Sequence, residues 1–286
     1  MISCIVLYLE TIRFFKPQGT ILLFLPCLIA LAFLDITYAI SYKTYIIFFL
    51  GAFLVRSSAC VVNDLLDIRF DKKVRRTKGR PVASGRIGRI EAMMLSIFLL
   101  SLALWCLFQL SPNAVFAGLL SPLLFTTYPL FKRFTYIPQF YLGICMSYGV
   151  LIVGLHIEGA LSWDMILLFV AMVFWTFGYD TIYAYQDIRD DKRVGIKSSA
   201  LLYGSRGKKY LVGSYIVFLV ITLVVATRFQ LGFLFFILLN ILGMYILARI
   251  QYLNLDDEAG CQTEFSQNVY YGSFIYLIIV LANYFS

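Results

Sequence analysis

Long apolar segments dominate this sequence and leave few folds open to it. About nine runs of predominantly apolar residues follow one another through the chain of 286 residues. A bilayer-spanning helix needs roughly 20 such residues, whereas a strand of a membrane barrel needs only about ten alternating ones. The runs therefore predict an all-α, polytopic membrane bundle of nine transmembrane helices, approximately at 18–36, 43–66, 89–110, 113–131, 137–156, 161–187, 209–227, 230–250 and 268–285.

The composition agrees with a single membrane-embedded domain spanning residues 1–286. Only 14% of the residues are charged, against roughly 25% in soluble domains. The net charge of +8 comes from basic residues in the short segments between apolar runs, so we expect a lipid bilayer and phosphate groups as partners, and no nucleic acid. Six cysteines without CxxC spacing are expected to serve packing. No obligatory protein partner is inferred.

The distribution of basic residues predicts an orientation. All but three of the 24 lysines and arginines (Lys43, Arg56 and Arg228) fall on one side of the predicted bundle. By the positive-inside rule, the N-terminus and the segments after the second and sixth runs are cytoplasmic. Without a cleavable signal or transit peptide pattern, we expect a multi-pass protein of the bacterial inner membrane.

Acidic residues at helical spacing follow the second apolar run, in the segment NDLLDIRFD. Asn63, Asp67 and Asp71 are spaced i, i+4, i+8, so a helix would place them along one face, with Asp64 close by. Carboxylates crowded on one face repel each other and call for a cation. Oxygen ligands with no nearby Cys or His favour Mg²⁺, which typically takes one or two carboxylates, waters and substrate phosphates.

A second segment, DTIYAYQDIRDDKRVGIK, repeats this chemistry after the sixth run, with Asp187 and Asp191 four residues apart. One such patch is compatible with a solvated helix end. Two patches on the same predicted membrane face, each followed by lysines and arginines, favour two Mg²⁺-bearing helices that hold one diphosphate. The predicted metal ligands are Asn63, Asp64, Asp67, Asp71, Asp187 and Asp191, of which Asp67, Asp71, Asp187 and Asp191 are also the predicted catalytic residues. Predicted diphosphate ligands are Arg76, Lys78, Arg80, Lys192 and Lys197.

The two Asp segments resemble the Asp-rich motifs of the UbiA superfamily of intramembrane prenyltransferases. TYPLFKRFTYIPQ (127–139) and IRFFKPQGT (12–20) are similar to elements of the branch that acts on 4-hydroxybenzoate. Gln18 departs from the aliphatic residue usual there, and Arg189 stands where many relatives have another acid, which leaves the second motif's metal ligands open. The resemblance covers nearly the whole chain.

This resemblance implies Mg²⁺-dependent transfer of a polyprenyl group from a polyprenyl diphosphate to 4-hydroxybenzoate, at the 3-position next to the hydroxyl, in ubiquinone biosynthesis. It implies that Arg13 and Lys132 are basic residues of the diphosphate or aromatic-acid pocket, and we predict that they bind the aromatic acid, although Lys132 with Arg133 is also compatible with a plain topogenic pair. Arg56 joins them because a charge inside an apolar span is costly and marks a functional site, unless it only snorkels to the interface. Tyr183 is a candidate for stabilising a carbocation by cation–π contact, against the plainer interpretation of a packing aromatic.

Two alternatives remain open at this stage. The acceptor can be another molecule used in the superfamily, namely haem, homogentisate, dihydroxynaphthoate or chlorophyllide. A cation-coupled transporter would instead bind ions at mid-membrane, whereas these carboxylates lie at span ends beside basic segments. Two other features receive no functional role: the acidic segment from Asp256 to Glu264 is expected to be a solvated loop, and His156, the one histidine, lies on the far side.

Overall fold

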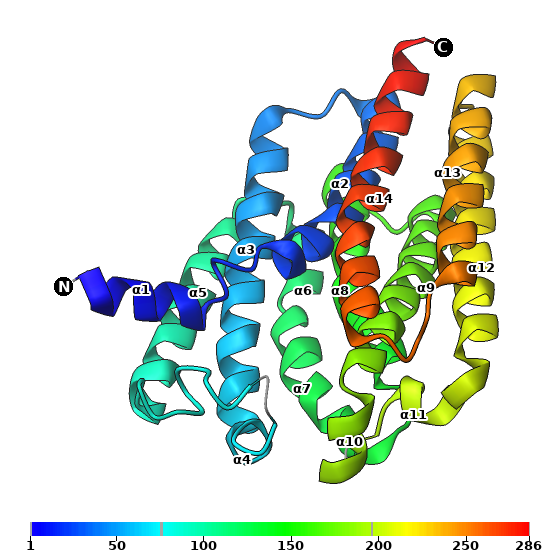
Figure 1. The fold of residues 1–286 in the computed structure, drawn as a ribbon. Helices are drawn as coiled ribbons and strands as arrows, with labels where there is room; N and C mark the ends of the chain where they lie inside the picture. The colour runs from blue at the N-terminus through cyan, green and yellow to red at the C-terminus, as the bar shows by residue number, and fades with distance from the viewer. Residues whose placement is uncertain (1, 75–76, 196, 286) are drawn as a thin grey trace.

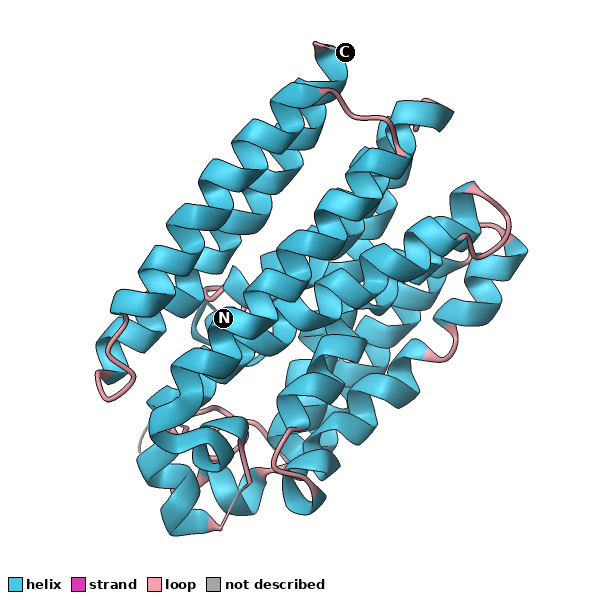
Figure 2. Cartoon of the chain, turned by 90° about the vertical axis from the view of Figure 1, so that its right-hand side faces the viewer, coloured by secondary structure: helices cyan, strands magenta, loops and turns pink. Residues whose placement is uncertain are grey.

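The computed structural model describes residues 2–74, 77–195 and 197–285, and every regular element in these residues is a helix (Figure 2). This confirms the predicted all-α class. The α-helices are α1 Ile2–Thr11, α2 Gln18–Tyr38, α3 Tyr42–Leu66, α4 Ile68–Asp71, α5 Arg89–Leu107, α6 Pro112–Gly118, α7 Ser121–Phe134, α8 Pro138–Ile157, α9 Trp163–Gln186, α10 Ile188–Val194, α11 Ser199–Tyr203, α12 Gly207–Arg228, α13 Phe233–Tyr252 and α14 Glu258–Tyr284, with a 3₁₀ turn at Gly204–Arg206.

Eight helical stretches in the described residues are long and apolar enough to cross a bilayer. The predicted run 113–131 is the exception to the expected nine, because it forms two helices, α6 and α7, with a turn at Leu119 and Leu120 between them. Pro122 lies in the first turn of α7 and has no N–H to donate to a preceding carbonyl. The ninth crossing is therefore a broken helix.

Both Asp segments lie at the same end of the bundle. In Figure 1, α4 and α10 both lie at the lower end, while the C-terminus lies at the upper end. The helix α1 runs across the bundle axis at its side and exposes Ile5 and Val6, as expected of an interfacial segment. A single site that uses both Asp segments requires them to lie at the same end of the bundle, and they do.

The core is apolar, but one buried polar network joins four helices. Asn268 of α14 accepts hydrogen bonds at its side-chain oxygen from the indole of Trp175 in α9 at 2.9 Å and from the hydroxyl of Tyr215 in α12 at 2.7 Å. Glu264 pairs with Arg249 of α13 at 2.7 Å and accepts from Tyr271 at 2.6 Å. Because each of these groups has a partner, the network can stay buried at little cost.

The same network shows that one sequence interpretation was wrong. The segment 256–264 was expected to be a solvated loop, but α14 begins at Glu258 and Glu264 is only 1% exposed. The guanidinium of Arg249, fifteen residues earlier on the neighbouring helix, compensates the charge of Glu264. The cysteine interpretation is confirmed where the structure tests it, because Cys27, Cys60, Cys106, Cys145 and Cys261 are buried and unbridged.

Candidate active site

The two Asp segments have the same backbone geometry. In each, a long helix ends one residue before the central aspartate and a short helix begins one residue after it. Asp67 has φ −98° and ψ 11°, and Asp187 has φ −98° and ψ 2°. The N–H groups of Asp71 and Asp191 donate to the carbonyls of these two residues, each at 2.8 Å. Each helix is thus interrupted for one residue at its central aspartate, but in the first segment the N–H of Asp67 still donates to the carbonyl of Asn63 at 2.9 Å, so the helical spacing continues across the interruption.

Two arginines bind the carboxylates of the first segment. Arg13 donates to both oxygens of Asp64 at 2.7 Å. Arg80 Nη1 bridges Asp64 at 3.1 Å and Asp71 at 3.0 Å. Asp64 is 1% exposed and Asp71 is 7% exposed. Buried carboxylates need such charged partners, and here the partners come from the turn before α2 and from the segment after α4.

The backbone at Arg13 is unusual and helps to place its side chain. Arg13 adopts a φ of 61°, in a region that few non-glycine residues occupy. It lies in the turn between α1 and α2, next to the end of α1. A second tie holds α1 here, because Arg86 donates to both oxygens of Glu10 at 3.0 and 3.1 Å. The contact between Glu10 of α1 and Arg86 thus helps to position Arg13 beside Asp64.

The other predicted diphosphate ligands are less enclosed. Lys78 and Lys192 are exposed. Lys197 donates to the carbonyl of Phe134 at 3.2 Å and lies 5.1 Å from the centre of the Tyr136 ring, so it covers the end of α7. Arg76 lies outside the described residues. Asn63, Asp67, Asp187 and Asp191 are partly buried at the same end of the bundle as Asp64.

Arg56 lies deeper in the bundle than the carboxylates. Eight residues of α3 separate it from Asp64, which is about 12 Å of helix rise. Its guanidinium packs on Gly19 of α2, where an added Cβ would approach Nη2 to 2.7 Å. Tyr128, Tyr179 and Tyr183 lie within electrostatic range of it.

These positions separate the three basic residues predicted for the aromatic acid. Arg13 is engaged by Asp64, Arg56 faces tyrosines, and the side chain of Lys132 is outside the description. The aromatic ring of Tyr183 packs on Phe265 of α14, with ring centres 4.8 Å apart. Sequence analysis missed Gly19, Tyr128 and Tyr179. The first two belong to the segments 12–20 and 127–139 that it had singled out, so the signal was present but unassigned.

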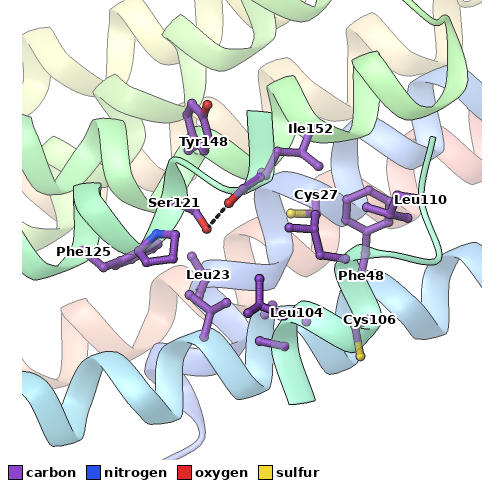
Figure 3. A pocket seen from close by; sticks show the side chains of 18 of the residues that line it. Leu23, Cys27, Phe48, Leu104, Cys106, Leu110, Ser121, Phe125, Tyr148 and Ile152 are labelled. Carbon is purple, nitrogen blue, oxygen red and sulfur yellow. Dashed lines mark hydrogen bonds between the residues drawn. The ribbon is translucent and has the colours of Figure 1, made fainter. Parts of the chain in front are cut away.

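An apolar cavity lies between α3 and its neighbours (Figure 3), and its lining residues in α3 run from Ile47 to Val55, one residue before Arg56. Its enclosed volume is about 110 Å³, within a larger space that is open to the surroundings. Val55 and Phe125 line it near Arg56 and Tyr128, and Phe48 and Leu110 line it at the opposite end. The lining of the cavity suits a hydrocarbon, whereas the charged groups at the Asp segments suit a phosphate.

The donor atoms of the first segment fit a magnesium ion. Nowhere in the described part of the chain do three or more Asp, Glu, His or Cys side chains converge as a ready-made metal site. Asp64 and Asp71 nevertheless converge on one cation, the guanidinium of Arg80. One or two carboxylates together with substrate phosphates and waters are a usual Mg²⁺ environment. The predicted ligands are therefore compatible with a metal that arrives together with a diphosphate.

The chain is similar to characterised proteins over nearly its full length. The model of the UbiA prenyltransferase family matches residues 23–278. The mitochondrial 4-hydroxybenzoate polyprenyltransferase of Bos taurus is 36% identical over 283 residues, covering 96% of this chain and 75% of that protein. The 4-hydroxybenzoate octaprenyltransferase of Histophilus somni (strain 129Pt) is 34% identical and covers 96% of both chains.

A solved structure has the same fold. It is that of a UbiA homolog from Archaeoglobus fulgidus bound to GPP and Mg²⁺, and it superposes with a TM-score of 0.62 over 94% of this chain and 99% of that one. The sequence identity is 18%, so this likeness supports the arrangement of the helices.

Proposed function

Because this chain belongs to the UbiA prenyltransferase family, we propose that it transfers a polyprenyl group from a polyprenyl diphosphate to 4-hydroxybenzoate. The observation that carries the proposal is the similarity, over 96% of the chain, to mitochondrial and bacterial proteins named for this reaction. The product is prenylated at the 3-position, next to the hydroxyl, and serves ubiquinone biosynthesis. The charged end and the apolar cavity described above suit the two parts of the polyprenyl diphosphate.

The two Asp segments and their basic neighbours hold the diphosphate. The predicted metal ligands Asp64, Asp67 and Asp71 would bind Mg²⁺ from one side and Asp187 and Asp191 from the other. When bound, Mg²⁺ neutralises charge that develops on the leaving diphosphate. Arg80 lies between two of these carboxylates and is placed to donate to phosphate oxygens, a geometry that a guanidinium serves well.

Arg56 is our assignment for the carboxylate of 4-hydroxybenzoate. It is a cation deep in a membrane helix, one residue after Val55 of the apolar cavity, and its guanidinium faces tyrosines. Its separation from Asp64 leaves room for the allylic carbon between the diphosphate and the ring. Tyr128 and Tyr179 lie near the guanidinium and offer hydroxyl groups for the acceptor. Arg13 and Lys132 remain predicted members of this basic pocket, although Arg13 contacts Asp64 in the structure.

The reaction follows from this placement. The bond between the allylic carbon and the diphosphate oxygen breaks, and the electron pair leaves with the diphosphate. The ring carbon next to the hydroxyl attacks the allylic cation, and that ring carbon loses its proton to restore aromaticity. Electrostatic groups aimed at the leaving diphosphate supply most of the rate enhancement in such a site. Tyr183, near Arg56 and packed on Phe265, is placed to stabilise the cation with its ring.

Product analysis tests the proposal directly. Membranes containing the protein, supplied with octaprenyl diphosphate, radiolabelled 4-hydroxybenzoate and Mg²⁺, should form a labelled lipid whose mass is that of 3-octaprenyl-4-hydroxybenzoate. Membranes without the protein are the control. Transfer to homogentisate or dihydroxynaphthoate, with none to 4-hydroxybenzoate, would keep prenyl transfer and refute the acceptor.

The orientation in the membrane is a separate prediction. The protein is multi-pass, and we propose that it lies in a bacterial inner membrane with the N-terminus and both Asp segments in the cytoplasm, because the basic residues gather there. Cysteines introduced by Lys78→Cys and Arg193→Cys should react with an impermeant thiol reagent only in inverted vesicles. The control Ala160→Cys, exposed in the turn between α8 and α9, should react only in intact cells. Labelling of Lys78→Cys and Arg193→Cys from opposite sides would exclude a shared site.

A further inference from the structure

The apolar cavity described above has a wall suited to a hydrocarbon. The polar side chains that line it are already partnered within the described residues: Ser121 donates to the carbonyl of Gly118 at 2.8 Å (Figure 3), and Tyr148 donates to that of Ala117 at 3.0 Å. The other lining groups are aliphatic, aromatic, thiol or glycine. A group bound here gains from the burial of carbon and not from hydrogen bonds.

The end of the cavity far from the carboxylates is covered by fixed groups. The aromatic ring of Phe48 is 7% exposed and lies 6.1 Å from the ring of His156. The backbone N–H of Ser111 donates to His156 Nδ1 at 3.0 Å, and the Ser111 hydroxyl donates to the carbonyl of Leu155 at 3.1 Å. These bonds hold the turn between α5 and α6 against the end of α8, next to Leu110. His156, which had no role in the sequence analysis, thus helps to anchor this end.

Three glycines line the cavity, and they differ in the space around them. A Cβ on Gly118 would lie 2.3 Å from Leu107 Cδ1, and a Cβ on Gly149 would lie 2.3 Å from Cys27 Sγ. A Cβ on Gly51 would have no described atom within 4 Å. Ile47 and Val55, one turn of α3 to either side, line the same wall. A side chain at position 51 would therefore project into open space on the cavity side of α3.

The position of Gly51 along α3 relates this space to the reaction. Thirteen residues separate Gly51 from Asp64, which is about 20 Å of helix rise. A tail whose diphosphate lies at the Asp segments passes Arg56 and Val55 before it reaches Gly51. A geranyl tail is too short to extend beyond this level, whereas an octaprenyl tail must continue past it.

We infer that this cavity receives the isoprenoid tail and that Gly51 determines how long a tail can enter. The inference rests on the proposed function, since it requires a polyprenyl diphosphate at the Asp segments. The lack of a side chain at position 51 leaves the channel open to tails that extend toward Phe48 and Leu110. A larger residue there would close the channel at that level and leave the space between Asp64 and Val55 unchanged.

The test compares Gly51→Leu with the wild type in binding of geranyl and octaprenyl diphosphate. Binding is measured with Mg²⁺ and without an aromatic acceptor, by the ligand-induced rise in melting temperature of the purified protein in detergent. The variant should bind octaprenyl diphosphate roughly tenfold to hundredfold more weakly, as expected for overpacking, and geranyl diphosphate equally well. Gly51→Ala, with a smaller obstruction, should give a smaller loss. Loss of the fold is not expected, because glycine within a helix is less favourable than these residues.

Gly213→Leu is the matched control. Gly213 also lies in a long apolar helix, α12, with no described atom within 4 Å of an added Cβ, but it does not line the cavity. Its variant should bind both diphosphates like the wild type. Unchanged octaprenyl binding by Gly51→Leu, or an equal loss for both tails, would overturn the inference. If the wild type bound both diphosphates but did not prenylate 4-hydroxybenzoate, only the proposed acceptor would be refuted. If it bound neither diphosphate, both the proposed function and the role of Gly51 would be refuted.

Discussion

Asp67→Asn and Asp187→Asn are each expected to reduce prenyl transfer about hundredfold to thousandfold, the usual cost of losing one electrostatic group that acts on the transition state. Each change removes a carboxylate charge and keeps the size of the side chain. The two positions are matched by structure, since both follow the end of a long helix and both have φ −98°. Rates of prenylated product formation in membranes, normalised to the amount of protein, provide the measurement.

The control for these variants is Asp256→Asn. Asp256 is exposed in the loop between α13 and α14, so loss of its charge should leave the rate unchanged. A chelator should abolish the wild-type rate, and added Mg²⁺ should restore it. Wild-type rates in either Asp variant, or full activity in excess chelator, would show that the leaving diphosphate does not depend on these carboxylates and a metal.

The second large effect should separate the two substrates. Arg56→Gln removes the cation assigned to the acceptor carboxylate, and we expect the apparent KM for 4-hydroxybenzoate to rise roughly tenfold to hundredfold, the usual cost of losing a charge-assisted hydrogen bond. The KM for the polyprenyl diphosphate should change little, because Asp64, which Arg80 contacts, is about 12 Å away along α3. Steady-state kinetics with each substrate varied in turn would measure the difference.

A neutral acceptor makes this test specific to the carboxylate. The methyl ester of 4-hydroxybenzoate cannot form an ion pair. The wild type and Arg56→Gln should therefore have similar KM values for that compound. Arg228→Gln is the control, because Arg228 pairs with Asp164 at the end of the bundle opposite the Asp segments. If Arg56→Gln impaired both acceptors equally, Arg56 would serve the structure, and the carboxylate would have to be bound by Lys132 or Arg13.

The sequence predicted the helical spans well because hydropathy over about 20 residues needs no knowledge of neighbours. It failed at the break between α6 and α7. Pro26 lies inside α2 without ending it, whereas Pro122 begins α7. Pro26 removes one backbone hydrogen bond inside α2, whereas Pro122 lies in the first turn of α7, where its missing N–H costs no intrahelical bond. The surrounding helices decide whether the chain breaks at such a residue. Sequence alone does not contain that information.

The candidate site was predictable in its residue types and not in its pairings. The Asp segments stand out by spacing and by their repeated D-I-R tripeptide, at Asp67–Arg69 and Asp187–Arg189. The bond between Arg13 and Asp64 joins residues 51 positions apart, and the one between Arg249 and Glu264 depends on how α13 and α14 pack. Local pattern can identify a charge that needs a partner, but only the tertiary fold supplies the partner.

The bridge from Arg80 to Asp64 and Asp71 bears on how the protein matures. Two arginines already balance these two nearly buried carboxylates, so the chain does not need a metal ion to keep uncompensated charge out of the bilayer. A zinc finger differs, because its fold forms only when the metal binds. Membrane insertion and helix assembly therefore need no metal ion to neutralise Asp64 and Asp71, and a proposed metal-dependent step would come after the protein has folded.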